Sequence, residues 1–267
     1  MRKDFLIKEH YKIEDLLQIM RILRGDDGCP WDREQDHDTI RKNMIEETYE
    51  VVEAIDRKDS AMLCEELGDV LLQVVFHARM EEEVGGFNFD DICDGICQKL
   101  ILRHPHIFGD VVAKTSEQVL NNWEEIKKKE KGQKTANDTL RSVPAVLPAL
   151  MRAEKVQHRA AKTGFDYPDA EGAFADLKSE VIELDEAMQS QDNAHMQEEL
   201  GDVLFSVVNV ARKLHIDPEE ALTRSTEKFM DRFEKVERIA TDRGMKMSDS
   251  SLDELNALWA EAKDHTN

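Results

Sequence analysis

The stretch Glu65–Arg79, EELGDVLLQVVFHAR, recurs further along the chain as Glu198–Arg212, EELGDVLFSVVNVAR. Eleven of the fifteen aligned positions are identical, and one constant offset relates the two copies. Each copy spaces its apolar residues three and four positions apart, which is typical of a helix with one buried face. Similarity at a fixed offset indicates duplication of a structural unit. The sequence therefore predicts two tandem helical-bundle units related by an internal repeat.

The rest of the chain favours an all-α fold. Only 12 Gly and 6 Pro interrupt long stretches with helical apolar spacing, and strand-like alternation is sustained nowhere. One segment, Lys127–Asp138, is highly charged and then polar, which is typical of a linker. We therefore expect a first unit at residues 1–130, a linker at residues 131–143 and a second unit at residues 144–267.

The composition limits the classes of partner. The 267 residues are 40% hydrophobic, which is enough for cores in two small domains. Lys and Arg number 36 against 57 Asp and Glu, so the formal net charge of −21 disfavours polymeric nucleic acid and membrane surfaces as partners. A small anion such as a triphosphate can still bind where divalent cations and a few basic side chains cancel the local charge.

The cysteines and the apolar runs indicate a cytoplasmic protein. Cys29, Cys64, Cys93 and Cys97 form no CxxC pair, and we interpret them as reduced cysteines of the core. Residues 1–10 show no secretory signal. The longest apolar runs fall far short of the roughly 20 residues that a membrane-spanning helix needs.

Four carboxylates are repeated together with these helices. Each copy has two acidic pairs one helical turn apart, at Glu47, Glu50, Glu66 and Asp69 and again at Glu180, Glu183, Glu199 and Asp202. If the helices pack antiparallel, the four carboxylates converge, and such a site needs cations to keep them ionised. Ligands that are all oxygen favour Mg²⁺ or Mn²⁺. We also expect the second helix of each pair to be mostly buried. Gly68 and Gly201 would let a partner helix or a phosphate approach closely.

Other interpretations of these patterns are weaker. A single acidic pair is usually a solvated helix face, but nearby solvent positions have diverged between the copies while all four acids are kept. A di-iron bundle needs Glu-x-x-His on two helices, and such spacing occurs only from Glu34 to His37. His104-Pro105-His106 is more typical of a helix end than of a metal site. The sequence has no P-loop, dinucleotide fingerprint or serine-hydrolase elbow.

Several motifs together are specific for one family. They are Gly28-Cys29-Pro30-Trp31-Asp32 through Gln35, Glu46-Glu47-x-x-Glu50 with Glu66-x-x-Asp69, Arg103-His104-Pro105-His106-x-Phe108, Arg159-Ala160-Ala161 with Gly164-Phe165-Asp166, and Lys228-Phe229-x-x-Arg232-Phe233. On these motifs, nearly the whole chain resembles the MazG-type nucleoside triphosphate pyrophosphohydrolases of the all-α NTP pyrophosphatase group.

The resemblance implies a fold and an activity. It implies tandem helical units and a homodimer whose helices pack across subunits. The implied reaction is Mg²⁺-dependent hydrolysis of NTP and dNTP substrates to the monophosphate and pyrophosphate, with attack of a metal-activated water on the α-phosphorus. The expected role is control of nucleotide pools. A non-catalytic helical regulatory or interaction protein whose acid clusters bind metal remains the alternative.

The resemblance also assigns residues. It makes the second set, Glu180, Glu183, Glu199 and Asp202, the catalytic metal ligands. The residues implied to bind the substrate are Lys127, Lys228, Arg232, Trp259 and Lys263. By charge alone the first set, Glu47, Glu50, Glu66 and Asp69, could bind metal as well, and only the resemblance favours the second unit. This chain departs from the Glu-Glu-x-x-Glu pattern at Ser179, next to the second set.

Overall fold

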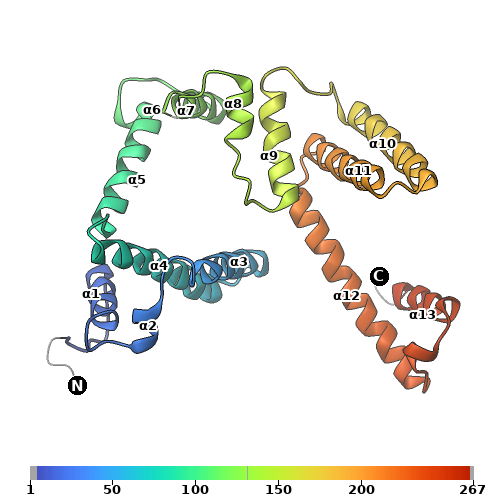
Figure 1. Ribbon diagram of the computed structural model, residues 1–267, viewed down its shortest axis with the longest axis horizontal. Coiled ribbons are helices and arrows are strands. Elements are labelled where there is room, and N and C mark those ends of the chain that lie inside the picture. The colour runs from blue at the N-terminus through green and yellow to red at the C-terminus, as the bar shows by residue number, and fades with distance from the viewer. Residues whose placement is uncertain (1–4, 131, 265–267) are drawn as a thin grey trace. The chain divides into compact units, whose positions relative to one another are not determined.

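The structure is a computed structural model that describes residues 5–130 and 132–264. Lys131, where the predicted linker starts, and both chain ends lie outside this range. The regular elements of the described residues are all helical, so the all-α prediction is confirmed for them (Figure 1). They are α1 (Ile13–Leu23), α2 (Pro30–Glu34), α3 (Arg41–Arg57), α4 (Ser60–Glu83), α5 (Phe89–Arg103), α6 (Pro105–Phe108), α7 (Ser116–Glu130), α8 (Ala136–Arg141), α9 (Ala149–Ala161), α10 (Ala170–Ser190), α11 (Asn193–Lys213), α12 (Pro218–Asp242), a 3₁₀ turn (Met247–Asp249) and α13 (Leu252–Asp264).

The chain divides into two compact units, Met1–Lys127 and Lys128–Asn267. Helix α8 falls within the segment that the sequence suggested as a linker, and it packs against α9 of the second unit. Thr135 caps the N-terminus of α8 by accepting a hydrogen bond from the Asp138 amide at 3.0 Å. The polar composition of this segment therefore reflects a capped short helix.

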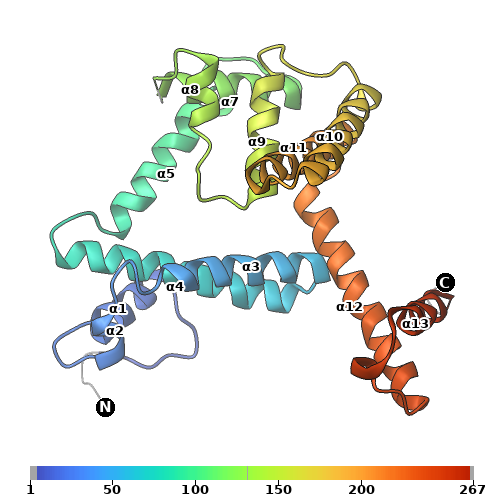
Figure 2. The same ribbon diagram turned by 45° about the vertical axis from the view of Figure 1, so that its right-hand side comes forward.

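A helical hairpin is repeated in the two units. Figure 2 shows α3 and α4 side by side in the first unit, and α10 packs in the same way against α11 in the second. Both turns consist of a left-handed residue followed by an aspartate. Lys58 has a φ of 55° and Gln191 a φ of 57°, and Asp59 and Asp192 then cap α4 and α11 by accepting backbone N–H groups. The repeat thus preserves the turn as well as the helices.

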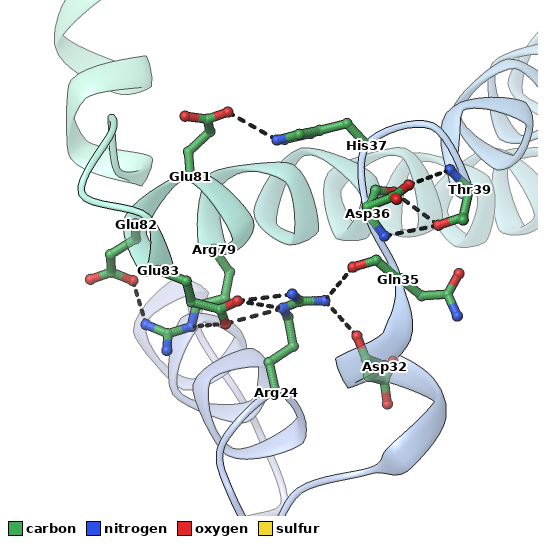
Figure 3. Close-up of polar contacts among 10 residues, drawn as sticks. All are labelled: Arg24, Asp32, Gln35, Asp36, His37, Thr39, Arg79, Glu81, Glu82 and Glu83. Carbon is green, nitrogen blue, oxygen red and sulfur yellow. Dashed lines mark hydrogen bonds and ion pairs between the residues drawn. The ribbon is translucent and has the colours of Figure 1, made fainter.

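The core of the first unit joins α1, α4 and the segment before α3. Its buried side chains are Met20, Ile40, Val75, Phe76 and Met80. Arg24 closes one end of this core, since its guanidinium donates to the carboxylate of Glu83 at 2.8 Å and to the backbone carbonyls of Asp32 and Gln35 (Figure 3). The same guanidinium lies 5.3 Å from the ring centroid of Phe76. This network holds the loop between α2 and α3 against the end of α4.

The second unit has two packed regions. Val236, Ala240, Leu258 and Ala262 form a core between α12 and α13. Near the other end of α12, α9 packs against α11, and the buried Gln157 donates from Nε2 to the carbonyl of Phe205 at 2.8 Å. The first of these regions carries the aromatic and basic residues suggested by the sequence. The second carries the acidic ones.

Two expectations about burial were wrong. Helix α11 is not mostly buried, because Leu200, Leu204 and Phe205 are 50%, 51% and 44% exposed. The helical period predicted an apolar face correctly, but no other part of the described chain covers it. The four cysteines are free but not in a core, since Cys64 and Cys97 are exposed and the other two are half-buried. A Cβ atom added at Gly68 or Gly201 would meet no atom within 4 Å, so no helix in the described part of the chain approaches closely there, and the approach of a phosphate stays a prediction.

Among the described residues, no helix is both long and apolar enough to cross a membrane.

Candidate metal centre and substrate site

The hairpin of α10 and α11 brings three acids of the second unit together. Glu180 lies on α10, Glu199 and Asp202 lie on α11, and each offers a carboxylate oxygen within 4.8 Å of the other two. Burial and the negative charges of Glu183 and Asp176 raise the pKa of Glu180. The antiparallel packing therefore brings carboxylates together so that their ionisation costs free energy. A bound divalent cation would lower this cost.

The fourth acid of this set is held by a neighbour on its own helix. Ser179 donates from its hydroxyl group to Oε1 of Glu183 at 3.1 Å. Glu183 is exposed, but it is close enough to Glu180 for its charge to act on that carboxyl. The position at which this chain departs from the Glu-Glu-x-x-Glu pattern thus contacts one of the suggested ligands.

The equivalent cluster in the first unit has the same plan. Glu47 on α3 and Glu66 and Asp69 on α4 offer oxygens within 4.8 Å of one another. Glu50 lies within hydrogen-bonding reach of both Glu47 and Glu66. Burial, followed by the charge of Asp69 for Glu47 and of Glu50 for Glu66, raises the pKa of both carboxyls. Geometry and charge alone therefore do not distinguish the two sets.

Three polar residues surround the second cluster and were not singled out from the sequence. His195 lies one turn before Glu199, and its Nε2 is 3.1 Å from the Glu199 Oε1 atom. Asp176 lies one turn before Glu180 and accepts a hydrogen bond from the buried Ser206 at 3.0 Å. The first unit has other residue types at these three positions. A position-by-position comparison of the two copies could have found them, because these three positions carry different residues in the two copies whereas the four acids are the same in both.

A tyrosine ties the loop before α10 to this cluster. The hydroxyl of Tyr167 hydrogen-bonds to Asp176, and this bond, with burial and the nearby charges, raises the pKa of Tyr167 to about 12. The same loop is held to α11 by Asp166, which pairs with Arg212 and with Lys213. Both residues therefore fix a loop that passes close to the acids.

The suggested basic and aromatic residues gather at the other end of the second unit. Arg232 on α12 lies over the Trp259 ring of α13, with 5.1 Å between its guanidinium carbon and the ring centroid. Phe229 tilts against the same tryptophan at 5.0 Å. Lys228 and Lys263 are exposed on the same two helices. Figure 1 shows α12 leading from the α9–α11 bundle out to α13, so within one chain these residues and the acids occupy different regions of the unit.

The first unit repeats the pairing of arginine with tryptophan. Arg103 of α5 lies 5.3 Å and Lys127 of α7 lies 4.6 Å from the ring centroid of Trp123. These three residues are the sequence counterparts of Arg232, Lys263 and Trp259. Lys127, suggested as a substrate-binding residue, thus packs on the aromatic ring of its own unit.

The two histidine motifs fall outside the acid clusters. Nδ1 of His37 lies 2.7 Å from Nδ1 of His77, and Nε2 of His37 lies 2.9 Å from Oε1 of Glu81 (Figure 3 shows the contact with Glu81). The two rings are parallel to within 1°. His104 ends α5 and starts α6, as expected for a helix end.

Comparison with known proteins identifies the family. Residues 35–108 and 170–237 each match the MazG nucleotide pyrophosphohydrolase domain, and the two matched segments contain the two acid clusters. This chain belongs to the MazG family. The membership makes it an enzyme, a nucleotide pyrophosphohydrolase by family, and it confirms the resemblance found in the sequence.

Curated MazG relatives are similar over almost their full length. A Thermotoga maritima protein named nucleoside triphosphate pyrophosphohydrolase/pyrophosphatase MazG is 43% identical over 94% of this chain and 95% of its own. The nucleoside triphosphate pyrophosphohydrolase of Escherichia coli K12 is 45% identical over 94% of this chain and 97% of its own. The chain is also 44% identical to 52% of a longer Bacillus subtilis protein, YabN, with 96% of this chain aligned. The similarity to the first two of these relatives thus covers 94% of this chain.

Proposed function

We propose that the second unit hydrolyses nucleoside and deoxynucleoside triphosphates to monophosphates and pyrophosphate, with Mg²⁺ or Mn²⁺ held by its acid cluster. The observation that carries the proposal is the set of three carboxylate oxygens from Glu180, Glu199 and Asp202 within 4.8 Å of one another. The names of the curated relatives in Thermotoga and Escherichia state the same substrate class. Control of nucleotide pools follows from this activity as the proposed cellular role.

The donor set fits a hard divalent cation. All the ligands are carboxylate oxygens, which suit Mg²⁺ and Mn²⁺ better than zinc or copper. The raised pKa of Glu180 indicates that the cluster resists full ionisation when no cation balances it. When bound, Mg²⁺ would neutralise phosphate oxygens and activate the attacking water. Glu180, Glu183, Glu199 and Asp202 would hold it at the α-phosphate.

The basic residues of α12 and α13 would bind the substrate. We assign Lys228 and Arg232 to the phosphates that leave as pyrophosphate, because arginine can make paired hydrogen bonds to phosphate oxygens. Trp259 would contact the base or the sugar, with Lys263 beside it, and Lys127 would also bind the substrate. The Trp259 ring already orients the Arg232 guanidinium, so less side-chain entropy would be lost on binding.

A second copy of the chain would bring these groups to the acids. Within one chain the Arg232–Trp259 pair and the acid cluster belong to different regions of the second unit. Helices α10, α11 and α12 also expose apolar side chains, among them Ile182, Leu200, Leu204, Met230 and Phe233. Burial of such side chains between subunits is the usual basis of a stable homodimer. We therefore propose a homodimer in which helices of one copy complete the site of the other.

We also propose a cytoplasmic location, which the free cysteines of the chain support.

One assay tests the reaction. The protein is incubated with a panel of NTPs and dNTPs and Mg²⁺, and the products are separated. Monophosphate and pyrophosphate are expected, and they should disappear when the metal is chelated. Release of orthophosphate would contradict the proposal.

The alternative raised by the sequence was a non-catalytic interaction protein, and family membership disfavours it. It predicts no turnover and no rise in melting temperature with Mg²⁺ and a non-hydrolysable triphosphate. Specific binding would raise that temperature.

A further inference from the structure

An imidazole on α11 contacts the least exposed acid of the second cluster. The Nε2 atom of His195 lies 3.1 Å from Oε1 of Glu199, which is one helical turn further along. Glu199 is only 9% exposed. A buried carboxylate loses much of its hydration, and a hydrogen-bond donor compensates part of that loss. His195 therefore supplies a polar partner to an acid that needs one.

The direction of this hydrogen bond follows from the chemistry of the two groups. An ionised carboxylate only accepts hydrogen bonds, so the Nε2 atom of His195 carries the hydrogen. A neutral imidazole donates without bringing a positive charge to a site for cations, whereas lysine or arginine would bring one. Glu199 has two carboxylate oxygens, and a donor on Oε1 leaves Oε2 for a cation. The contact thus orients the acid without occupying its second oxygen.

The donor is carried by a rigid element. His195 and Glu199 lie four residues apart on α11, a spacing that places both side chains on one face. Asp192 caps the start of this helix and accepts the backbone N–H of His195 at 3.4 Å. Groups fixed on a helix hold a ligand more precisely than groups on a loop. The geometry of the pair is therefore set by the helix itself.

The first unit lacks this donor. Met62 stands at the position equivalent to His195, and its thioether cannot donate a hydrogen bond. The acid one turn further along is Glu66, and its neighbour within hydrogen-bonding reach is another carboxyl, that of Glu50. The equivalent acids of the two units therefore have different partners.

The second unit has a similar donor on the other helix of its hairpin. Ser179 of α10 donates to Glu183 at 3.1 Å, where the first unit has Glu46. A hydroxyl from one helix and an imidazole from the other thus each donate to a carboxylate of the second set. The two sets have the same acids but differ in the groups that orient them.

We propose that His195 is a positioning residue of the cation site, whose hydrogen bond to Glu199 orients this carboxylate and raises the affinity of the second cluster for a divalent cation. The inference rests on the proposed function, because it takes this cluster as the metal site. Hydrogen bonds to metal ligands commonly change metal affinity by about 10- to 100-fold. The His195 side chain is 48% exposed, so the lower end of that range is expected.

Binding of Mn²⁺ alone tests this role. All proteins carry Glu66→Gln, which removes a ligand of the first set, and electron paramagnetic resonance of free Mn²⁺ measures the affinity of the remaining cluster. His195→Met introduces the residue of the first unit and removes the donor. His195→Gln keeps a nitrogen donor on a side chain of similar reach. Gln197→Met is the matched control, because Gln197 is exposed on the same helix and a spacing of two residues points it away from His195.

We expect His195→Met to bind Mn²⁺ about ten-fold more weakly than the Glu66→Gln parent. His195→Gln should stay within about three-fold of the parent, and Gln197→Met should match it. The melting temperature without metal should change by less than about 2 °C in all three variants, since each replaces an exposed side chain.

Unchanged affinity in His195→Met, or equal losses in His195→Met and His195→Gln, would overturn the role of this hydrogen bond. A weaker affinity accompanied by a clear fall in the metal-free melting temperature would assign His195 to stability and overturn it as well. In these cases the wild-type protein would still release pyrophosphate, and the proposed function would stand. If the parent bound no Mn²⁺, this inference would fail, and if the wild type also released no pyrophosphate, both proposals would fail together.

Discussion

Ser179 donates a hydrogen bond to Glu183 across one turn of α10, with 3.1 Å between the two oxygens. The first unit has Glu46 at the equivalent position, where a carboxylate would repel its neighbour one turn away. The serine therefore orients an acid of the second cluster while adding no negative charge.

Ser179→Ala should weaken activation by Mg²⁺ by about three- to ten-fold, because the lost hydrogen bond contributes about 1 kcal/mol to the orientation of Glu183. The concentration of Mg²⁺ at half-maximal pyrophosphate release measures the effect. Glu46→Ala is the matched control in the first unit and should leave that concentration unchanged. A similar shift in both variants would show that this hydrogen bond has no special role.

Glu183→Ala should lower kcat/KM on the order of 1,000-fold with the fold retained, because the cation then loses a ligand at the reacting phosphate. Glu50→Ala, the equivalent change in the first unit, should cost less than about three-fold. Circular dichroism would establish that both variants fold. Comparable losses would refute the assignment of catalysis to the second unit.

Glu180→Gln should stabilise the metal-free protein slightly, by up to about 0.5 kcal/mol at pH 7. The pKa of Glu180 is raised in the folded state, so the folded protein binds this proton more tightly than the unfolded chain does. Stability is therefore lost as the pH rises through the carboxylate range, and it stays lower at neutral pH. Neutral glutamine removes that cost. Thermal melts with and without Mg²⁺ measure it, and the variant should lose the rise in melting temperature that the metal gives the wild type.

Asp166→Asn should destabilise the second unit on the order of 1 kcal/mol at pH 7, allowing for solvent screening of a pair that is partly exposed. The hydrogen bond from Arg212, followed by that from Lys213, lowers the pKa of Asp166 to about 2. Its contribution is complete above about pH 4, where the unfolded carboxylate is also ionised. It should be lost as the pH falls from about 4 to 2.

Urea unfolding at pH 7 and at pH 2.5 measures this effect of Asp166→Asn. The difference from the wild type should shrink at the lower pH. Asp231→Asn, at an exposed position of α12, is the control and should show no such change. A pH-independent difference for Asp166→Asn would indicate that packing, and not charge, causes the destabilisation.

His77→Gln should reduce the loss of stability between pH 7.5 and pH 5.5. Burial, followed by the neighbouring His37, lowers the pKa of His77. The unfolded chain therefore takes up this proton first, and the folded state loses stability as the pH falls below about 6.5. The drop in melting temperature over this range should be smaller by about 2 °C in the variant. His10→Gln, at an exposed position, should melt as the wild type at both pH values. An unchanged drop in His77→Gln would contradict the expectation.

Local patterns in the sequence were sufficient for several features of the fold. The helical period located α4 and α11, and the preserved register of the acids predicted that Glu47 meets Glu66 across a hairpin. Period, register and N-capping depend on neighbours within one or two turns. The turn itself was less predictable, because Lys58 and Gln191 adopt a positive φ that is more usual for glycine.

The sequence alone did not predict which helix faces are buried, because burial depends on which other residues cover a helix. An apolar face has the same pattern whether it is buried in a core or exposed, as Phe76 and Phe205 illustrate at 4% and 44% exposure. The same limit applied to the cysteines, since Cys64 lies on a helix but on a face that this chain leaves open.

By itself the sequence determined that the chain is helical, that its unit is repeated, and that each repeat carries the same four carboxylates, because these features follow from spacing along the chain. The tertiary structure decided which acids meet, that Arg232 lies on Trp259 away from them, and that Asn209 of the second unit lines a cavity. Those facts depend on which side chains fill the space between helices, and in the first unit Phe76 fills the place where the second has Asn209 and an open cavity.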